Sequence, residues 1–404
     1  MEPTVRRNVL ILAACQALAM TGSSLLITTA ALIGQMLATD KSLATLPLGL
    51  QFVATMLTTI PASLLMKRVG RRAGFTVGAL FGAGGGLISS LAIFAGSFSG
   101  FCLGNTLIGV AMGFALFYRF AAADAADERS RSRAISFVMA GGVVAAVSGP
   151  ELAKWSRDLF EPALYVGCLA VVAALWAVAV LLLQFVTIPR PSEAERRSTG
   201  RPLGVIARQP AFVVAVLGGM IGYGSMSLVM TATPLAMVAH HHDFADAAFV
   251  IQWHALGMFA PSFFTGRLIA RFGVLNVMLA GAALLVGCIA VNLSGTTMLQ
   301  FWVALVALGL GWNFLYIGST TLLTEAYEPA ERAKVQALND FLVFGAVAAS
   351  SFSSGALQNR FGWDAVNYAV VAPVLLVLFA VLWLRQRRAA AAVVGQPSEA
   401  TGES

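Results

Sequence analysis

The segment Ser63-Leu-Leu-Met-Lys-Arg-Val-Gly-Arg-Arg72 lies between two long apolar stretches, and Gly266-Arg-Leu-Ile-Ala-Arg-Phe-Gly273 repeats its pattern later in the chain. The arginine and the glycine that the two segments share are 203 positions apart in both cases. Glu128-Arg129 and Glu331-Arg332 recur at the same separation. Several matches at one fixed separation indicate that the chain is built from two related halves.

Apolar residues dominate the rest of the chain. Of its 404 residues, 58% are hydrophobic and 11% are charged, and its mean hydropathy is +0.81. Soluble domains usually contain about 25% charged residues, so this composition excludes a water-soluble globule and a disordered chain. Apolar runs of about 20 residues between charged or glycine-rich turns predict membrane-spanning helices. We expect twelve, near residues 8–37, 45–66, 73–97, 100–123, 134–153, 163–187, 210–238, 248–270, 275–296, 299–324, 337–356 and 367–384.

These spans fall into two groups of six. The expected fold class is therefore an all-α membrane protein, with twelve transmembrane helices in two pseudo-symmetric six-helix bundles. The expected divisions are an N-terminal bundle (1–187), a polar cytoplasmic linker (188–209), a C-terminal bundle (210–388) and a disordered tail (389–404). Repeated halves of this kind are typical of transporters that bind substrate near the middle of the membrane.

The distribution of lysine and arginine predicts the orientation in the membrane. The chain has 26 of these residues and a formal net charge of +7. The predicted spans place 21 of them on one face, together with both termini. Cytoplasmic loops are enriched in lysine and arginine, so we expect this face in the cytoplasm. The positive charge then indicates contact with membrane lipids, and we expect no nucleic-acid partner.

The segment from Ser63 to Arg72 resembles the motif G-x-x-x-D-R-x-G-R-R between helices 2 and 3 of the major facilitator superfamily. The second copy of this pattern, which ends at Gly273, falls where that family repeats the motif. The resemblance covers nearly the whole chain. It implies a secondary transporter that works by alternating access and closes a gate on its cytoplasmic side. The residues that we assign to this gate are Lys67, Arg68, Gly70, Arg271, Gly273 and Asp340.

The sequence departs from the family motif at two positions of this loop. Ser63 replaces the first glycine, and Lys67 stands where the family usually has aspartate. In the family that aspartate faces the start of helix 11, which here carries Asp340 about one turn from its expected start. We therefore expect a Lys67–Asp340 ion pair at the closed gate. The alternative is a lysine that extends to the membrane surface beside a polar helix start.

Polar and aromatic residues are the candidate substrate contacts, and most lie in helices that line the central cavity in the family. Aromatic rings and uncharged hydrogen-bonding groups suit a flat or amphipathic organic solute of low charge. Each polar residue could instead hydrogen-bond to a neighbouring helix. The candidates are Gln16, Asn105, Tyr118, Arg119, Tyr223, Ser227, His254, Trp312, Asn313 and Tyr316.

Few ionisable residues lie within the predicted spans. Arg119 either extends to the membrane surface or holds an electronegative part of the substrate. No carboxylate is expected at mid-membrane, so His254 is the candidate for a coupling proton, with a neutral role in the cavity as the alternative. We interpret the run 240–242, three consecutive histidines, as a solvated loop and expect no metal site, because neighbouring histidines cannot all face one ion.

The phrases at 117–124 and 336–341 resemble those of bacterial permeases that mostly lack an assigned substrate, and that branch is similar to permeases proposed to import vitamins such as riboflavin. We therefore expect a monomeric permease of the bacterial inner membrane that moves a small organic solute of low charge, and uptake of a vitamin such as riboflavin is one function that the resemblance suggests. Drug or metabolite efflux by proton antiport is one alternative, and a solute-sensing membrane receptor is another. The sequence has no H-E-x-x-H motif and no G-x-x-x-x-G-K-[ST] loop, so we expect neither an enzyme nor a cofactor.

Overall fold

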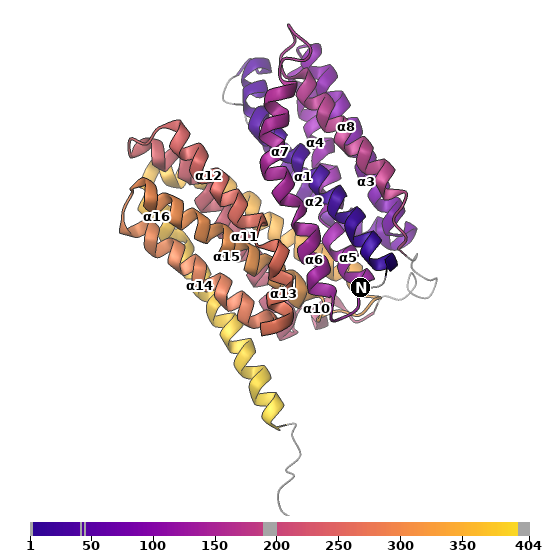
Figure 1. Ribbon diagram of the computed structural model, residues 1–404, viewed down its shortest axis with the longest axis vertical. Coiled ribbons are helices and arrows are strands. Elements are labelled where there is room, and N and C mark those ends of the chain that lie inside the picture. The colour runs from indigo at the N-terminus through magenta and orange to yellow at the C-terminus, as the bar shows by residue number, and fades with distance from the viewer. Residues whose placement is uncertain (1–2, 41–42, 44–45, 189–199, 395–404) are drawn as a thin grey trace, which may run out of the picture.

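A computed structural model describes residues 3–40, 43, 46–188 and 200–394, and the regular structure of these residues is entirely helical (Figure 1). The N-terminal half contains α1 (Pro3–Leu37), α2 (Leu46–Val69), α3 (Arg71–Phe94), α4 (Phe98–Ala115), α5 (Tyr118–Ala125), α6 (Arg131–Met139), α7 (Gly141–Ser156) and α8 (Val166–Leu183). The C-terminal half contains α10 (Leu203–Ile206), α11 (Pro210–Ala239), α12 (Phe244–Phe259), α13 (Ser262–Phe272), α14 (Val274–Ser294), α15 (Met298–Leu323) and α16 (Arg332–Val394).

The described residues provide the twelve expected spans. Eleven helices are long and apolar enough to cross a membrane. The twelfth span is split into two helices. The apolar part of α12 (Phe249–Phe259) ends at Ala260-Pro261, and α13 continues beyond this break. Proline lacks the N–H group that would continue the helical hydrogen bonds. The long helix α16 contains two spans, which are separated at Gly362, where φ is 81°.

Two further spans are interrupted where continuous helices were expected. The helix expected at 134–153 divides at Ala140 into α6 and α7, next to Gly141-Gly142, and glycine is a weak helix former. The helix expected at 100–123 divides at Leu116-Phe117 into α4 and α5, with no glycine or proline at the break. The guanidinium of Arg119 donates a hydrogen bond to the carbonyl of Leu116 at this second interruption.

The structure also bears on the linker and the tail. The linker contains the short helix α10, and residues 189–199 lie outside the described part. Helix α16 continues to Val394, so the tail expected to be disordered from residue 389 begins as helix, while residues 395–404 lie outside the described part.

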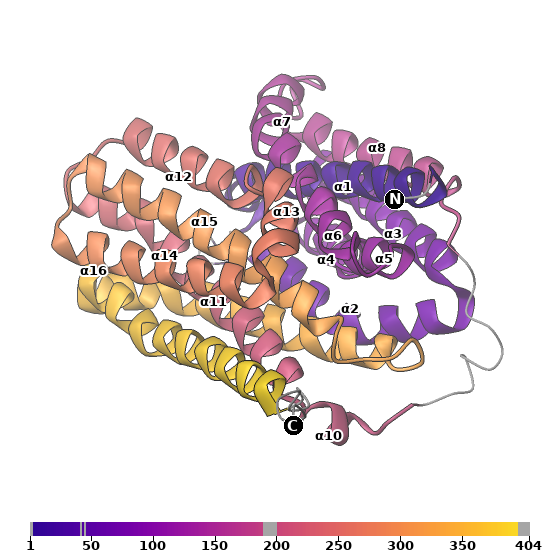
Figure 2. The same cartoon turned by 60° about the horizontal axis from the view of Figure 1, so that its bottom comes forward.

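The bundles have two ends, which we name by their loops. The basic face carries the start of α1, the turns at 70 and 273, and the loops at 126–130 and 324–331. The far face carries the opposite turns, at 95–97, 157–165, 240–243, 295–297 and 362. The ribbons of α6 and α13 adjoin near the basic face, whereas those of α7 and α12 diverge toward the far face (Figure 1). Helix α2 runs alongside α16 (Figure 2).

Hydrogen bonds join the two bundles near the basic face. The hydroxyl of Ser132 on α6 donates to the carbonyl of Gly266 on α13 over 3.1 Å, and the N–H of Gly266 donates to the hydroxyl of Ser136 over 3.1 Å. Also near the basic face, where α2 and α16 meet, the hydroxyl of Ser63 donates to the carbonyl of Ala333 over 2.5 Å. Ser63, which replaces a motif glycine, therefore supplies a contact between the bundles.

Each bundle contains a matching close crossing of two helices at a glycine. A Cβ added to Gly109 of α4 would lie 2.3 Å from the backbone oxygen of Gln51 on α2. In the second half, a Cβ added to Gly309 of α15 would lie 2.6 Å from the backbone oxygen of His254 on α12. The equivalent crossings support the two-halves interpretation and show that the helix backbones inside each bundle touch directly.

Gly109→Ala and Gly309→Ala are expected to lower the melting temperature of the detergent-solubilised protein by a few degrees, because each added methyl group overlaps a backbone oxygen. Such overpacking costs about 1–3 kcal/mol. Gly84→Ala in α3 is the matched control, since its added Cβ meets nothing within 4 Å, and alanine favours a helix over glycine by about 0.5–1 kcal/mol. The same melting temperature for all three variants would contradict the crossings.

Candidate functional site

Arg119 of α5 and Asp340 of α16 form an ion pair that is buried between the bundles. Nη2 of Arg119 lies 2.5 Å from Oδ1 of Asp340, and the two side chains are 3% and 0% exposed. Nη1 of Arg119 donates over 2.8 Å to the carbonyl of Leu116, at the break between α4 and α5. The amide of Asn339 donates to Oδ1 of Asp340 over 2.9 Å. Because its partners come from opposite bundles, the pair joins the two halves within the spanning region.

Each partner of this pair retains unused hydrogen-bonding capacity. Among the described residues, Nε of Arg119 and Oδ2 of Asp340 are buried and have no hydrogen-bond partner. A buried ion pair is stable only when geometry and further hydrogen bonds compensate for lost hydration. Oδ2 of Asp340 could bind a proton, and Nε of Arg119 could donate a hydrogen bond to a ligand atom.

Aromatic side chains pack beside this ion pair. The aromatic cluster, as we call it, consists of Tyr223 on α11, Phe259 on α12, Trp312 and Tyr316 on α15, and Phe344 on α16. The rings of Trp312 and Tyr316 are stacked, with centroids 5.1 Å apart and planes 16° apart. Tyr223 meets both rings edge-on at 5.2 Å. The guanidinium of Arg119 lies 4.9 Å from the centre of the Tyr316 ring, so a cation–π contact connects the cluster to the ion pair.

The structure thus brings together four of the candidate substrate contacts, Arg119, Tyr223, Trp312 and Tyr316. Other candidates lie in separate contacts. Gln16 is buried on α1, and Asn105 is buried on α4, where its amide donates to the carbonyl of Phe101. The ring of Tyr118 meets the ring of Phe75 edge-on, with centroids 4.8 Å apart. The hydroxyls of Ser227 and Ser351 are 2.7 Å apart. Their roles as substrate contacts stay predictions.

Asn313 uses its side-chain amide to hold the broken span together. It donates to the carbonyl of Met258 over 2.6 Å and to the hydroxyl of Ser262 over 2.7 Å, and it accepts from the hydroxyl of Thr265 over 2.6 Å. These partners lie on both sides of the break between α12 and α13. The contacts match the alternative of hydrogen bonding between helices, which the sequence left open.

His254 is wholly buried on α12. Its Nδ1 lies 2.9 Å from the carbonyl oxygen of Leu305 on α15, and its Nε2 has no partner among the described residues. The side chain therefore contributes to the packing of two helices of one bundle. Its assignment to a coupling proton stays a prediction.

The two motif loops share the backbone conformation that their repeated sequence predicts. Gly70 has φ 90° and ψ 162°, and Gly273 has φ 84° and ψ 150°. Only glycine adopts a positive φ of this kind readily. Arg68 and Arg271 are both exposed beside these turns, so the arginines shared by the two loops lie at the surface.

The predicted Lys67–Asp340 pair is wrong, because the structure pairs Asp340 with Arg119. Helix α16 begins at Arg332, so Asp340 lies about two turns into it, or roughly 12 Å along the axis. Asp340 is therefore about one turn deeper in its helix than we expected. Arg119 lies within the span Phe98–Ala125, where it reaches Asp340 directly.

Arg71, which was not among the candidates, supplies a charged contact at the basic face. Its Nη2 lies 2.9 Å from Oδ2 of Asp124 and donates to Oε1 of Gln336, in the opposite bundle, over 2.6 Å. Arg332 approaches the same carboxylate at 3.7 Å. The motif contains four consecutive or nearly consecutive basic residues, and nothing in its pattern indicates which one turns inward.

The linker is fastened to the start of α16 by Arg201 and Glu331. The backbone N–H and Nε of Arg201 each donate to Oε1 of Glu331 over 2.7 Å, and Nη2 lies 2.6 Å from Oε2. These hydrogen bonds hold the pKa of Glu331 at about 2, below its ordinary value of 4.5. A lowered carboxylate pKa means that the contact stabilises the fold above pH 4.5 and is lost as the pH falls toward 2.

Comparison with known proteins identifies the family. A family model described as Major Facilitator Superfamily matches residues 12–251 and 215–400. The chain belongs to the Major Facilitator Superfamily. The predicted fold class and the transporter class are thereby confirmed, and the protein is a multi-pass membrane transporter of small solutes that works by alternating access.

Individual relatives agree with the family assignment. The riboflavin transporter RfnT of Brucella anthropi is 43% identical over 389 residues, which cover 96% of this chain and 98% of that protein. The drug efflux pump JefA of Mycobacterium tuberculosis is 28% identical over 180 residues, which cover 44% of this chain and 34% of that protein. The crystal structure of the transporter FucP in the outward conformation matches with a TM-score of 0.76 at 18% identity, covering 93% of this chain and 98% of that one.

Arg119→Gln or Asp340→Asn alone is expected to destabilise the protein by about 3–5 kcal/mol, because each change leaves a buried charge unpaired. The double variant is expected to lose much less than the sum of the two single losses. Melting temperatures of all four proteins in detergent provide the measurement.

The matched control is the exposed pair Glu151–Lys154, whose side chains are 65% and 74% exposed. The corresponding cycle at this surface pair is expected to give a coupling below about 1 kcal/mol. Additive losses at Arg119 and Asp340 would contradict an energetically important pair.

Proposed function

We propose that this protein takes up riboflavin. The observation that carries the proposal is the 43% identity to a riboflavin transporter along 96% of the chain. An identity that extends over both bundles includes the surface between them, where transporters with repeated halves bind substrate.

The aromatic cluster supports this substrate. Riboflavin has a flat, uncharged tricyclic ring, which binds well between aromatic side chains. The stacked pair Trp312–Tyr316 and the edge-on ring of Tyr223 offer such surfaces. Arg119 lies beside them and can donate from Nε to a ring carbonyl oxygen. A site with one neutralised ion pair and several rings suits a neutral heterocycle better than a charged metabolite.

In this proposal the basic face lies in the cytoplasm and the protein resides in the bacterial inner membrane as a monomer. The excess of arginine and lysine on the basic face supports this orientation. The hydrogen bonds at Ser63, Ser132 and Gly266 then close the cytoplasmic side. Uptake requires these contacts to break after substrate has entered from the far face.

A proton on Asp340 is the proposed coupling ion. Asp340 is a wholly buried carboxylate that pairs across the bundles and has one oxygen, Oδ2, without a partner among the described residues. Protonation there would remove the charge that attracts Arg119 and would weaken the contact between the bundles. Asp340 thus has a direct link to bundle separation, whereas His254 contacts a helix of its own bundle.

Efflux is the alternative direction of transport, and the match to a drug efflux pump over 44% of the chain supports it. That match is lower in identity and shorter than the match to the riboflavin transporter. A solute-sensing receptor would bind riboflavin without accumulating it. Direction and accumulation of labelled solute separate these possibilities.

Expression of the protein is expected to let a riboflavin-auxotrophic bacterium grow on limiting riboflavin and to raise its uptake of labelled riboflavin. Trp312→Leu is expected to reduce uptake at limiting riboflavin by about tenfold, because a stacking surface is lost. Trp312→Phe retains a ring and is expected to recover part of the loss. Trp302→Leu is the control, since Trp302 packs against Trp253 outside the aromatic cluster. Absence of uptake by the unmodified protein would refute the proposal.

Asp340→Asn is expected to abolish uptake driven by a proton gradient while exchange of labelled for unlabelled riboflavin continues in vesicles. Exchange needs bundle movement with substrate bound, but no change in protonation. His254→Gln is expected to retain gradient-driven uptake with an unchanged pH profile. Gradient-driven accumulation by Asp340→Asn would show that the coupling site lies elsewhere.

A further inference from the structure

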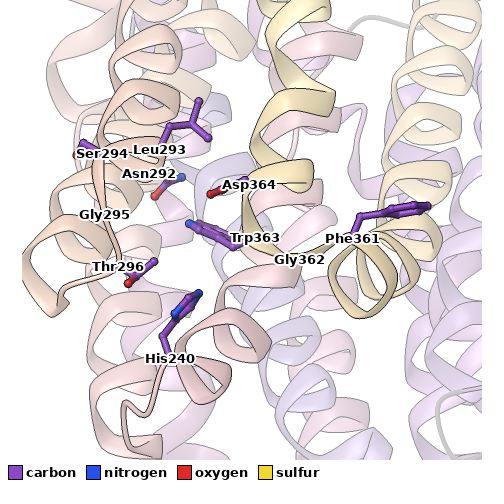
Figure 3. Close-up of a pocket in the computed structure, with 10 residues that line it drawn as sticks. All are labelled: His240, Asn292, Leu293, Ser294, Gly295, Thr296, Phe361, Gly362, Trp363 and Asp364. Atoms are coloured by element: carbon purple, nitrogen blue, oxygen red, sulfur yellow. The ribbon is translucent and has the colours of Figure 1, made fainter.

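A second site lies at the far-face end of the C-terminal bundle, away from the ion pair and the aromatic cluster. A cavity of about 420 Å³ opens there, where α11 ends, α14 turns into α15, and α16 bends at Gly362 (Figure 3). All its lining residues belong to the C-terminal bundle. The cavity therefore persists in any movement that leaves this bundle intact.

Four polar groups around this cavity have no hydrogen-bond or ion partner in the described part of the chain. Two are buried, Oδ1 of Asn292 and Nε1 of Trp363, in residues that are 1% and 3% exposed. The other two are the exposed side chains of Asp364 and His240. The Asn292 amide nitrogen donates to Asn367 over 2.8 Å, whereas its oxygen has no partner among the described residues. Buried polar groups normally have partners, so these two indicate an occupant.

The arrangement of the four groups indicates the chemistry of that occupant. Asn292 and Asp364 lie toward one end of the cavity and His240 toward the other, with the indole of Trp363 between them (Figure 3). Asn292 Oδ1 and the Asp364 carboxylate accept hydrogen bonds, and the carboxylate is negatively charged. The indole N–H of Trp363 only donates, and the imidazole of His240 can donate. Such a site fits a ligand with a protonated amine at one end and anionic oxygens nearby.

The position of the cavity favours a lipid as the source of this ligand. The spans of α11 and α14 end at the cavity, at Ala239 and Ser294, and lipid headgroups lie where apolar spans end. Phe361 at the rim is 69% exposed, so an apolar side chain beside the cavity is available to lipid. A ligand in the cavity therefore lies at the edge of the bilayer.

We propose that this cavity binds the headgroup of an aminophospholipid, such as phosphatidylethanolamine, from the far-face leaflet. The ammonium group donates to Asn292 and Asp364, and the phosphate accepts from Trp363 and His240. This site is independent of riboflavin transport and makes one lipid class a specific ligand of the C-terminal bundle.

Native mass spectrometry of the full chain tests the proposal, after incorporation into nanodiscs with equal amounts of phosphatidylethanolamine, phosphatidylcholine and phosphatidylglycerol. Preferential retention of phosphatidylethanolamine is expected, because the quaternary amine of phosphatidylcholine cannot donate a hydrogen bond and phosphatidylglycerol has no positive charge. Asp364→Asn and Trp363→Phe are each expected to reduce this retention by about tenfold.

Two matched controls separate the site from general effects. Trp302→Phe removes another indole N–H that has no partner among the described residues, but lies outside the cavity. Asp158→Asn removes an exposed carboxylate from the far face of the other bundle. Both are expected to retain phosphatidylethanolamine like the unmodified protein. Equal retention of the three lipids, or unchanged retention in Asp364→Asn, would overturn the proposal. Binding of soluble phosphoethanolamine without lipid preference would overturn the assignment to a lipid.

Discussion

Charge neutralisation within the membrane is the constraint on which the arrangement of the two bundles depends. An isolated arginine or aspartate at the centre of a spanning helix costs about 2.5–3.5 kcal/mol. Here Arg119 belongs to one bundle and Asp340 to the other, and they meet at 2.5 Å. Each bundle therefore carries a buried charge that the other bundle neutralises, so the pair favours the closed arrangement at the basic face.

The contacts around this pair are individually weak, which suits a protein that must open and close. Ser63 and Ser132 bridge the bundles through single neutral hydrogen bonds to carbonyl oxygens. A typical hydrogen bond contributes only about 0.5–1.5 kcal/mol net. The ion pair between Arg119 and Asp340 is a stronger link than these neutral hydrogen bonds, and the aromatic cluster lies directly beside it. Substrate bound at the cluster would be next to the contact that controls separation.

The sequence predicted the twelve spans, the repeat and the family correctly, because apolar length and motif spacing depend on local sequence. It did not predict how deep Asp340 lies in the membrane-spanning region or which side chains face the opposite bundle. Asp340 was expected near a helix end, since the start of α16 was placed too late, and Lys67 was therefore given as its partner. The break at Leu116-Phe117 has no glycine or proline to mark it, whereas Pro261 and Gly141-Gly142 were visible signals for the other two. Of the ten candidate substrate contacts, four meet between the bundles, because which face of a helix turns inward depends on packing that composition does not encode.

The glycine crossings at Gly109 and Gly309 have a mechanical consequence. Where two backbones touch without intervening side chains, a helix cannot tilt against its neighbour without collision or loss of contact. Deformation within a bundle is therefore stiff, whereas the surface between the bundles is held by side chains that can change rotamer. Thermal motion should therefore concentrate at the surface between the bundles. The two bundles should then rotate as rigid bodies, and binding of a solute or ion should change their relative position rather than their internal structure.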